Sequence, residues 1–515
     1  MLSAWSPLFG FKEEPMARGR LMKTSQSRLF TIEDRAGPSH SPVFQSFARM
    51  QGVTWDQGDI TRIRRPDPNR YGGWITTDRI RGAAGDPNTT LQFRLLRELS
   101  SVLKLVRKGC AFDAQLHIGA CKDPQDFNLG WEKVIVLEGA EATSYGTDDL
   151  GALDQGEDAV INENVPIAGE DYYEIKPILG TQLAETEVTQ EIIAVAICDS
   201  VECGECGRNS DGCQRVFAAT KTVGGSPGAG SRIVYSKNGG ALIGITQVTT
   251  MGAAENMSDL GCVGPYLVAI SADGLAIHYA VTDDIIDDTE TWTKTVVGLV
   301  AAKTPQALFS LGRTFTWIVA AGGYIYFSSD ITAGATSVQT AGAITTQQLN
   351  DIHGIDELNL VAVGASNAVL VTTDGGITWA AVTGPAVGVA LNTVWMKDEV
   401  TWFIGDAGGN LWYTTDAGIT WAQKRFSGDG AGVVRRIKFA TPTVGYMSHD
   451  TAAPRGRIFR TIDGGNSWYA LPETGPVLPL ADRFNDLAVC GRDPNLVYAG
   501  GLEDDGVDGM LLKIA

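Results

Sequence analysis

Four cysteines stand close together near the middle of the chain, with the spacing C-x4-C-x2-C-x6-C: Cys198, Cys203, Cys206 and Cys213. Four thiolates in such a short segment can hold a structural zinc ion in tetrahedral geometry. The same thiols can form two disulfides in an oxidising medium. The first three match the spacing of plant-type iron–sulfur loops, but the fourth lies too close for that site. We expect a local zinc or disulfide staple, with a loop of free thiols as the alternative.

The other reactive residues form no recognisable constellation. Two cysteines flank one expected hairpin and can pair, Cys110 and Cys121, whereas two others stand in strand contexts and are expected in the core, Cys262 and Cys490. Four histidines lack the spacing of metal ligands: His117, His278, His353 and His449. The sequence shows no glycine-rich phosphate loop, nucleophile elbow or His-Glu-x-x-His motif. It therefore predicts no catalytic and no cofactor-binding residue.

Three aspartates recur in nearly identical segments, Thr372–Trp379, Thr414–Trp421 and Thr461–Trp468. An acid at such a turn is a candidate for acid catalysis, but three similar copies cannot share one active site. The pattern Ser/Thr-x-Asp-x-Gly-x-Thr-Trp instead suits a fastener. Asp accepts backbone amides across its own turn, Gly supplies a positive φ, and Trp buries a large ring between neighbouring units. The predicted structural residues are Asp374, Gly376, Trp379, Asp416, Gly418, Trp421, Asp463, Gly465 and Trp468.

The three aspartates are 42 and 47 residues apart, and each unit contains several short strands between Gly/Asp/Asn turns. Weaker relatives precede them at similar intervals: Ser328–Asp330, Thr282–Asp283 and Ser236–Gly240. Such a period is the size of one β-propeller blade. We expect a propeller over residues 191–515, with seven blades, or six as the alternative. Because an open ring would expose two sheet edges, the last blade is expected to borrow a strand near Glu191–Asp199.

These repeats resemble the Asp-box, or bacterial neuraminidase repeat, which occurs in sialidases, endoglucanase propellers, sortilin-type receptors and a photosystem II assembly factor. The resemblance implies the fold more strongly than it implies a function. Sialidases carry Arg-Ile-Pro before their first box, whereas this chain has Arg232-Ile233-Val234. Arg313, Arg435 and Arg483 do not stand in the family's arginine contexts. A sialidase-like glycosidase is therefore the least favoured reading.

The first 190 residues lack the repeat and divide into an irregular arm, 1–42, and a β-sandwich or barrel, 43–190. Strand-like segments are Arg62–Arg65, Gly73–Thr77, Thr90–Phe93, Lys133–Leu137 and Tyr172–Ile178, and one helix is expected over Leu95–Lys108. Residues 1–108 carry a net charge of +8 and residues 109–190 carry −14. Opposite charges in the two halves can stack copies of the chain head to tail, unless the folded surface mixes them.

Residues 43–190 resemble a phage tail-tube subunit in architecture. That resemblance implies self-assembly into rings or a stacked tube whose acidic lumen passes DNA without binding it specifically. The propeller would then face outward on the virion and bind cell-surface glycans weakly. The alternative is a bacterial adaptor, periplasmic or extracellular, whose propeller binds a glycan or protein partner.

The composition of the chain argues against nucleic-acid binding and membrane association. The net charge of −19 argues against general nucleic-acid binding and against docking on an anionic membrane. Glycine is frequent, with 61 in 515 residues, as expected for many tight turns. No apolar run reaches the ~20 residues that span a bilayer, so no membrane insertion is expected. Met1–Pro15 lacks the basic flank and apolar core of a secretory signal.

Overall fold

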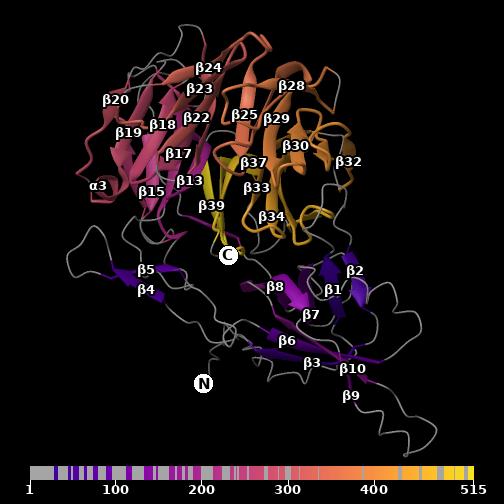
Figure 1. Ribbon diagram of the computed structural model, residues 1–515. Helices are drawn as coiled ribbons and strands as arrows, with labels where there is room; N and C mark the ends of the chain where they lie inside the picture. The colour runs from indigo at the N-terminus through magenta and orange to yellow at the C-terminus, as the bar shows by residue number, and fades with distance from the viewer. Residues whose placement is uncertain are drawn as a thin grey trace, which may run out of the picture.

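The computed structural model contains two assemblies of β-strands, a small one from the first part of the chain and a large ring from the rest (Figure 1). The residues that it describes are 28–32, 44–47, 50–56, 63–66, 74–78, 88–94, 112–118, 133–142, 146–148, 162–168, 171–176, 180–183, 190–198, 213–222, 232–236, 239, 243–251, 255–271, 276–287, 289–295, 303–311, 314–333, 336–385, 388–426, 432–451, 455–471, 481–491, 493–503 and 509–515.

The ring consists of seven four-stranded antiparallel sheets, the blades of a β-propeller. Their innermost strands contact one another in sequence, and the last contacts the first, so the ring is closed. The predicted seven-bladed propeller is therefore confirmed. From the innermost strand outward, the first three blades are β13 (Gln190–Ile197), β14 (Val216–Thr222), β15 (Arg232–Ser236) and β16 (Ile243–Gln247); β17 (Met257–Val263), β18 (Tyr266–Ser271), β19 (Ile277–Val281) and β20 (Thr293–Thr295); and β21 (Pro305–Leu311), β22 (Phe315–Ala320), β23 (Tyr324–Ser328) and β24 (Ser337–Ala341).

The remaining four blades carry the clearest repeats. In the same order they are β25 (Leu349–Gly354), β26 (Leu360–Gly364), β27 (Ala368–Thr372) and β28 (Ala380–Thr383); β29 (Leu391–Met396), β30 (Trp402–Asp406), β31 (Leu411–Thr414) and β32 (Ala422–Lys424); β33 (Val433–Phe439), β34 (Gly445–Asp450), β35 (Gly456–Thr461) and β36 (Tyr469–Ala470); and β37 (Ala481–Val489), β38 (Val497–Glu503), β39 (Gly509–Ile514) and β12 (Gly180–Gln182).

The second strand of a blade is buried along most or all of its length because neighbouring blades cover both of its faces. All five residues of β26 and of β30 are buried. A strand with one solvated face would alternate polar and apolar residues instead. The outermost strands show the opposite burial, since three of the four residues of β28 are exposed. The cores of the ring therefore lie between blades.

The seventh blade is completed by a strand from before the first blade. The short strand β12 pairs with β39, with Gly180 opposite Ile514. The predicted closing strand, Glu191–Asp199, was placed one strand too late in the chain. That segment is β13, the innermost strand of the first blade, where small buried residues such as Ala194 fit the crowded centre of the ring.

The front part forms a nine-stranded sheet in the order β2-β1-β7-β8-β10-β6-β3, with β11 beside β8 and β9 beside β10. A separate hairpin pairs β4 with β5. The bounds are β1 (Arg28–Ile32), β2 (Phe44–Phe47), β3 (Met50–Asp56), β4 (Ile63–Pro66), β5 (Trp74–Asp78), β6 (Asn88–Arg94), β7 (Phe112–Ile118), β8 (Lys133–Ala142), β9 (Gly146–Asp148), β10 (Asn162–Ala168) and β11 (Asp171–Ile175).

All five predicted front strands are present, at β4, β5, β6, β8 and β11. The predicted irregular arm over residues 1–42 is wrong at β1, which pairs with both β2 and β7. The sequence Arg-Leu-Phe-Thr-Ile of β1 is rich in β-forming residues, and this signal was overlooked. The predicted helix Leu95–Lys108 lies outside the described residues.

Two weaker relatives of the repeat fold differently from the three clear copies. At Thr282–Asp283 the chain forms a single helical turn, α3 (Thr282–Ile286), instead of the expected box turn. At Ser328–Asp330 the carboxylate of Asp330 accepts the backbone amide of Thr332 at 2.9 Å and its hydroxyl at 2.7 Å, which makes a shorter turn. Within the part of the chain described, no helix has the length and apolar character needed to cross a membrane.

Candidate functional site

The carboxylate of Asp374 is occupied by its own turn. It accepts the hydroxyl of Thr372 at 2.8 Å, and the backbone amide and hydroxyl of Thr378 at 2.9 and 2.6 Å. These bonds, chiefly those from Thr378, lower the pKa of Asp374 to about 2. A carboxylate held ionised in this way is a poor proton donor near neutral pH. Asp416 makes the same bonds with Thr414 and Thr420.

The glycine and tryptophan of each box face the preceding blade. Gly418 has φ +81°, and a Cβ there would lie 2.6 Å from Val382 of the blade before it. The indole of Trp421 donates to the carbonyl of Thr383 at 2.8 Å, and that of Trp379 donates to Gln339 at 3.2 Å. Each box therefore closes its own hairpin and also fastens one blade to the next.

The third box differs because the front part covers it. Gln115 of β7 donates to the carbonyl of Ile462 at 2.5 Å. Ile462 packs in one apolar cluster with Val134 and Val136 of β8. Burial raises the pKa of Asp463, against the lowering effect of the bonds from Ser467, whereas the partly exposed Asp374 has a lowered pKa. The same motif thus serves as a docking point in the sixth blade.

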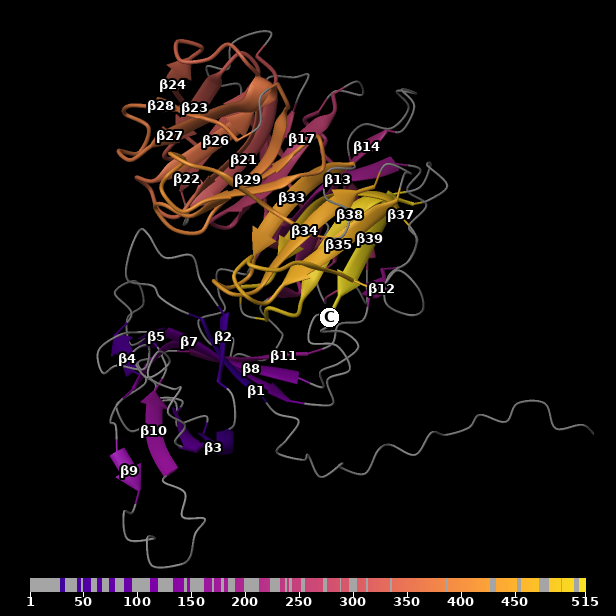
Figure 2. The same ribbon diagram turned by 90° about the vertical axis from the view of Figure 1, so that its right-hand side faces the viewer.

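Further contacts extend this junction to the seventh blade. The hydroxyl of Tyr173 in β11 lies 2.8 Å from that of Thr441, in the turn after β33. Asn495, in the turn before β38, donates to the carbonyl of Glu174 at 2.9 Å and accepts the amide of Lys176 at 3.0 Å. Arg460 donates to the carbonyl of Lys176 at 3.0 Å. In Figure 2 the front strands β8 and β11 lie below the blades that these residues belong to.

In the fourth and fifth blades the box turns are exposed at the position that corresponds to Asn466 of the sixth blade. Ile377 is 84% exposed and Ile419 is 82% exposed, each within its box turn. Isolated apolar residues on a surface are ordinary, but fully exposed isoleucines at the same position of two adjacent repeats are not required by the turn. The covered sixth box and these two exposed boxes define the Asp-box face of the propeller, which is the candidate functional site.

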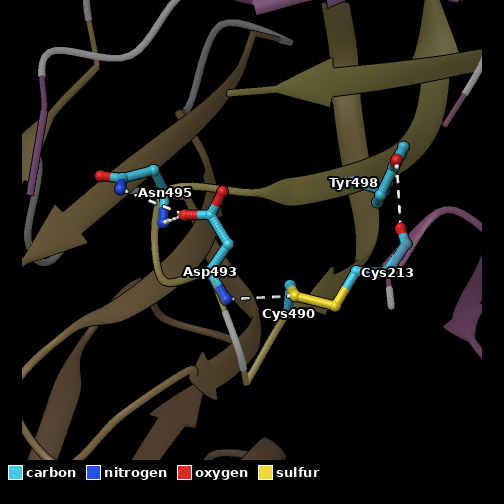
Figure 3. Close-up of a disulfide and its surroundings, with 5 residues drawn as sticks. All are labelled: Cys213, Cys490, Asp493, Asn495 and Tyr498. Atoms are coloured by element: carbon cyan, nitrogen blue, oxygen red, sulfur yellow. Dashed lines mark hydrogen bonds between the residues drawn. A yellow bond between two sulfur atoms is a disulfide. The ribbon is translucent and has the colours of Figure 1, made fainter. Parts of the chain in front are cut away.

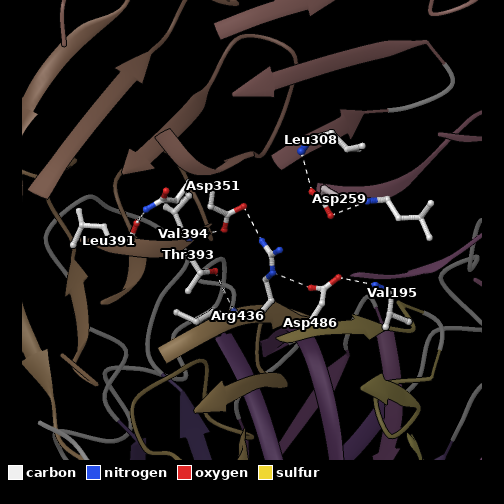
Figure 4. A network of polar contacts seen from close by, with 12 residues as sticks. Val195, Asp259, Leu308, Asp351, Leu391, Thr393, Val394, Arg436 and Asp486 are labelled. Carbon is white, nitrogen blue, oxygen red and sulfur yellow. Dashed lines mark hydrogen bonds and ion pairs between the residues drawn. The ribbon is translucent and has the colours of Figure 1, made fainter. Parts of the chain in front are cut away.

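A second polar site lies at the centre of the ring (Figure 4). Each innermost strand contains a β-bulge, and the residues that follow the seven bulges are Ala194, Asp259, Ala307, Asp351, Thr393, Arg436 and Asp486. Four of these side chains accept a backbone amide of the next blade: the amides of Leu308, Val394, Ile437 and Val195, at 2.9, 2.9, 3.2 and 2.8 Å. The bulge residues therefore form a second set of fasteners.

Arg436 links three blades within this central ring. Its guanidinium lies 2.9 Å from Asp351 and 2.8 Å from Asp486. Burial alone would lower the pKa of Arg436, but the two carboxylates raise it above its usual value. Burial raises the pKa of Asp259 to about 6, against the opposing effect of Arg436. The ring was missed in the sequence, although Asn-Asp or Asn-Thr recurs at 350–351, 392–393 and 485–486 and could have revealed it.

Buried titratable groups make the propeller sensitive to acid. Burial lowers the pKa of His278 to about 4 and that of His353 to about 3. The unfolded chain therefore binds more protons at these histidines below pH 6.5, and their contribution to stability is lost as the pH falls. Asp259 acts in the opposite direction, because its raised pKa favours the folded state as the pH falls from 6 toward 4.

The histidines outweigh the aspartate, so we expect a net loss of about 3 kcal/mol in the free energy of unfolding from pH 6.5 to 4.5. Urea titrations at both pH values measure it. His353 accepts the amide of Met396 at its Nδ1 atom, and His353→Asn keeps an acceptor there. Because Asp259 offsets most of the remaining contribution of His278, this variant should lose most of the net pH dependence, about 2 of the 3 kcal/mol. An unchanged dependence would contradict the assignment.

The cysteine cluster does not pair within itself at the two positions that the structure describes. Cys198 forms a disulfide with Cys262, and Cys213 forms one with Cys490 (Figure 3). The predicted local staple is corrected accordingly, whereas Cys490 lies in the core as predicted and Cys262 packs against core residues, both as disulfides. A sulfur in a disulfide offers no thiolate to zinc, so these bonds replace a four-cysteine zinc site.

The two disulfides join the first blade to both of its neighbours. Cys198 and Cys262 connect it to the second blade, and Cys213 and Cys490 connect it to the seventh. Cys203, Cys206, Cys110 and Cys121 lie outside the described residues. Among the residues described, no group of three or more His, Cys, Asp or Glu side chains is arranged to hold a metal ion.

The arginines considered for a sialidase-like site do not converge. Arg435 pairs with Asp450 on its own blade, and Arg483 donates to Glu191 at 2.6 Å. Arg313 lies outside the described residues.

Comparisons with known proteins agree with this geometry. A protein-family model described as "Photosynthesis system II assembly factor YCF48" matches residues 335–477, the segment that contains the three boxes. Among curated proteins, none matches the sequence. The C-terminal part of the chain is an Asp-box β-propeller.

Three solved structures are similar to part of this chain. YCF48 from Cyanidioschyzon merolae is 13% identical, with a TM-score of 0.47 over 65% of this chain and 98% of that one. A structure described as YCF48 bound to D1 peptide is 13% identical, with a TM-score of 0.47 over 66% and 95%. Virginiamycin B lyase from Staphylococcus aureus is 12% identical, with a TM-score of 0.49 over 66% and 99%.

Proposed function

We propose that this chain is a non-enzymatic binding protein whose propeller recognises a protein partner, with the front part as an adaptor. The family model that matches residues 335–477 describes an assembly factor, and this description supports a protein as the partner. The proposal corresponds to the adaptor reading of the sequence, with a protein favoured over a glycan.

One observation carries the proposal. The Asp-box face already holds a protein module within this chain, because the front part packs on Ile462 and bonds to its carbonyl through Gln115. A face that accepts β-strands and apolar side chains at the sixth blade is suited to accept another protein at the blades beside it. The carboxylates of Asp374 and Asp416 accept hydrogen bonds within their own turns and stay ionised. This face therefore offers a partner contact area and negative charge, but no free catalytic acid.

The virion reading remains a prediction that the comparisons do not address. It requires copies of the chain to assemble through residues 43–190 into rings or tubes, and it assigns the propeller to surface glycans. These requirements make it separable from the proposed function by experiment.

The test exposes the purified full chain to a displayed library of random peptides and to a glycan array, and examines the same sample by negative-stain microscopy. We expect enrichment of peptides that bind saturably in the micromolar range, with discrete particles in the images. Binding to glycans alone, or assembly into rings or tubes, would overturn the proposal.

A further inference from the structure

Four large apolar side chains are exposed on the Asp-box face of the third, fourth and fifth blades. Val338 is 43% exposed, Leu358 is 49% exposed, and the two box isoleucines Ile377 and Ile419 are more than 80% exposed. We call these four residues the aliphatic patch. Solvent-exposed groups of this kind mark interaction sites when they occur together.

Hydrogen bonds show that two members of the patch, Leu358 and Ile377, lie on neighbouring turns. The amide of Gly375 donates to the carbonyl of Leu358 at 3.0 Å, which brings the turn after β25 against the box of Ile377. Gln339, next to Val338, donates to the carbonyl of Gly375 at 2.8 Å. The four residues thus lie on three consecutive blades, with Leu358 and Ile377 on adjoining turns of the fourth blade.

Acidic side chains surround the patch and stay ionised. Hydrogen bonds within their own turns lower the pKa values of Asp330, Asp356, Asp374 and Asp416. Glu357 and Glu399 are exposed in the turns between the first and second strands of the fourth and fifth blades. Lys397 lies at the far border, where its amino group approaches Gly464 of the sixth blade. The aliphatic patch therefore lies in a field of negative charge.

The patch continues an interface that the chain already uses. The box amide donates to the carbonyl of Leu358 in the fourth blade, of Val400 in the fifth and of Thr443 in the sixth, so these three residues are equivalent. At the sixth blade the hydroxyl of Tyr173 bonds to that of Thr443, and the front part covers the box. The face occupied at the sixth and seventh blades is thus continuous with the aliphatic patch.

We infer that the aliphatic patch binds a segment of a protein partner that combines aliphatic with basic side chains. This inference rests on the proposed function and names its partner class. Aliphatic side chains would remove Ile377 and Ile419 from water, and Lys or Arg side chains would pair with the surrounding carboxylates. An acidic segment would be repelled by the carboxylates, and a purely polar segment would leave the isoleucines in water.

Fluorescein-labelled peptides test the inference by anisotropy with the full chain. The probes are an alternating Lys-Leu peptide, a Glu-Leu peptide and a Lys-Ser peptide of equal length. We expect saturable binding of the Lys-Leu peptide, at least about tenfold weaker binding of the other two, and weakening with added salt. The double variant I377S/I419S should lower the affinity for the Lys-Leu peptide at least about tenfold.

The matched control is Ile245→Ser, which replaces an isoleucine that is 41% exposed on β16 of the first blade, far from the patch in sequence and repeat. It should bind the Lys-Leu peptide as the parent chain does. Equal binding by I377S/I419S, or equal affinity for the Glu-Leu peptide, would overturn the inference. So would a dimer of the parent chain that I377S/I419S abolishes, because the occupant would then be a second copy. If I377S/I419S binds the Lys-Leu peptide as the parent chain does, but the parent chain still binds peptides from the library, the inference fails and the proposed function stands.

Discussion

Replacing Arg436 with methionine should lower the free energy of unfolding by about 3–5 kcal/mol, because it leaves buried carboxylates without their partner. The side chains of Asp351 and Asp486 are 8% and 3% exposed, and both lie within 3 Å of the guanidinium. Methionine fills similar volume, so the loss reflects charge and not a cavity. Urea titration of the full chain at pH 7 measures the change.

The neighbouring residue provides the control for this experiment. Arg435 precedes Arg436 on the same strand, but its side chain is 32% exposed and pairs with a single carboxylate, that of Asp450, which is 11% exposed. Arg435→Met should cost less, about 1–2 kcal/mol, because its side of the pair is partly exposed to solvent. The triple variant R436M/D351N/D486N should recover part of the loss, since it removes the uncompensated charges together. Equal costs for the two single variants would show that the central ring does not depend on Arg436.

Removing the disulfide between Cys213 and Cys490 should destabilise the propeller by about 5 kcal/mol, the largest effect expected for a change outside the central ring. The bond spans 277 residues and ties the first blade to the seventh. Without it the unfolded chain gains the entropy of a very large loop, and the ring can open between these blades. Thermal unfolding of C213S/C490S under non-reducing conditions measures the loss.

The second disulfide supplies a comparison of the same chemistry. Cys198 and Cys262 enclose only 64 residues, so C198S/C262S should cost about 1 kcal/mol less than C213S/C490S. A reducing agent should lower the stability of the parent chain and affect each double variant less. If reduction leaves the unfolding of the parent chain unchanged, these bonds do not hold the ring.

The propeller could be predicted because its information is local and repeated. Each box contains its hydroxyl, acid, glycine and indole within eight residues, as in Thr372–Trp379, and the interval between boxes equals one blade. The strands β38 and β39 were also predictable, since their apolar runs stand between glycine-rich turns. Patterns of this kind can be recognised in the sequence without knowledge of tertiary contacts.

What the sequence could not indicate depends on contacts between distant segments. Cys213 has nearer candidates in sequence than Cys490, yet the ring brings the distant one beside it. Likewise, the opposite electrostatic behaviour of Asp374 and Asp463 follows from what covers each box, and both stand in nearly the same local sequence. Burial by another part of the chain has no signature within the motif itself.

The origin of β12 has a consequence for how the protein is made. This strand leaves the ribosome before any blade is complete, and it pairs with β39, roughly 330 residues later. Until β39 is made, β12 has no strand to pair with, and the first blade lacks the seventh blade as its second neighbour. Such non-local pairing makes the final step slow relative to the hairpins formed during synthesis. Six blades can fold as they emerge, while ring closure waits for the last translated strand.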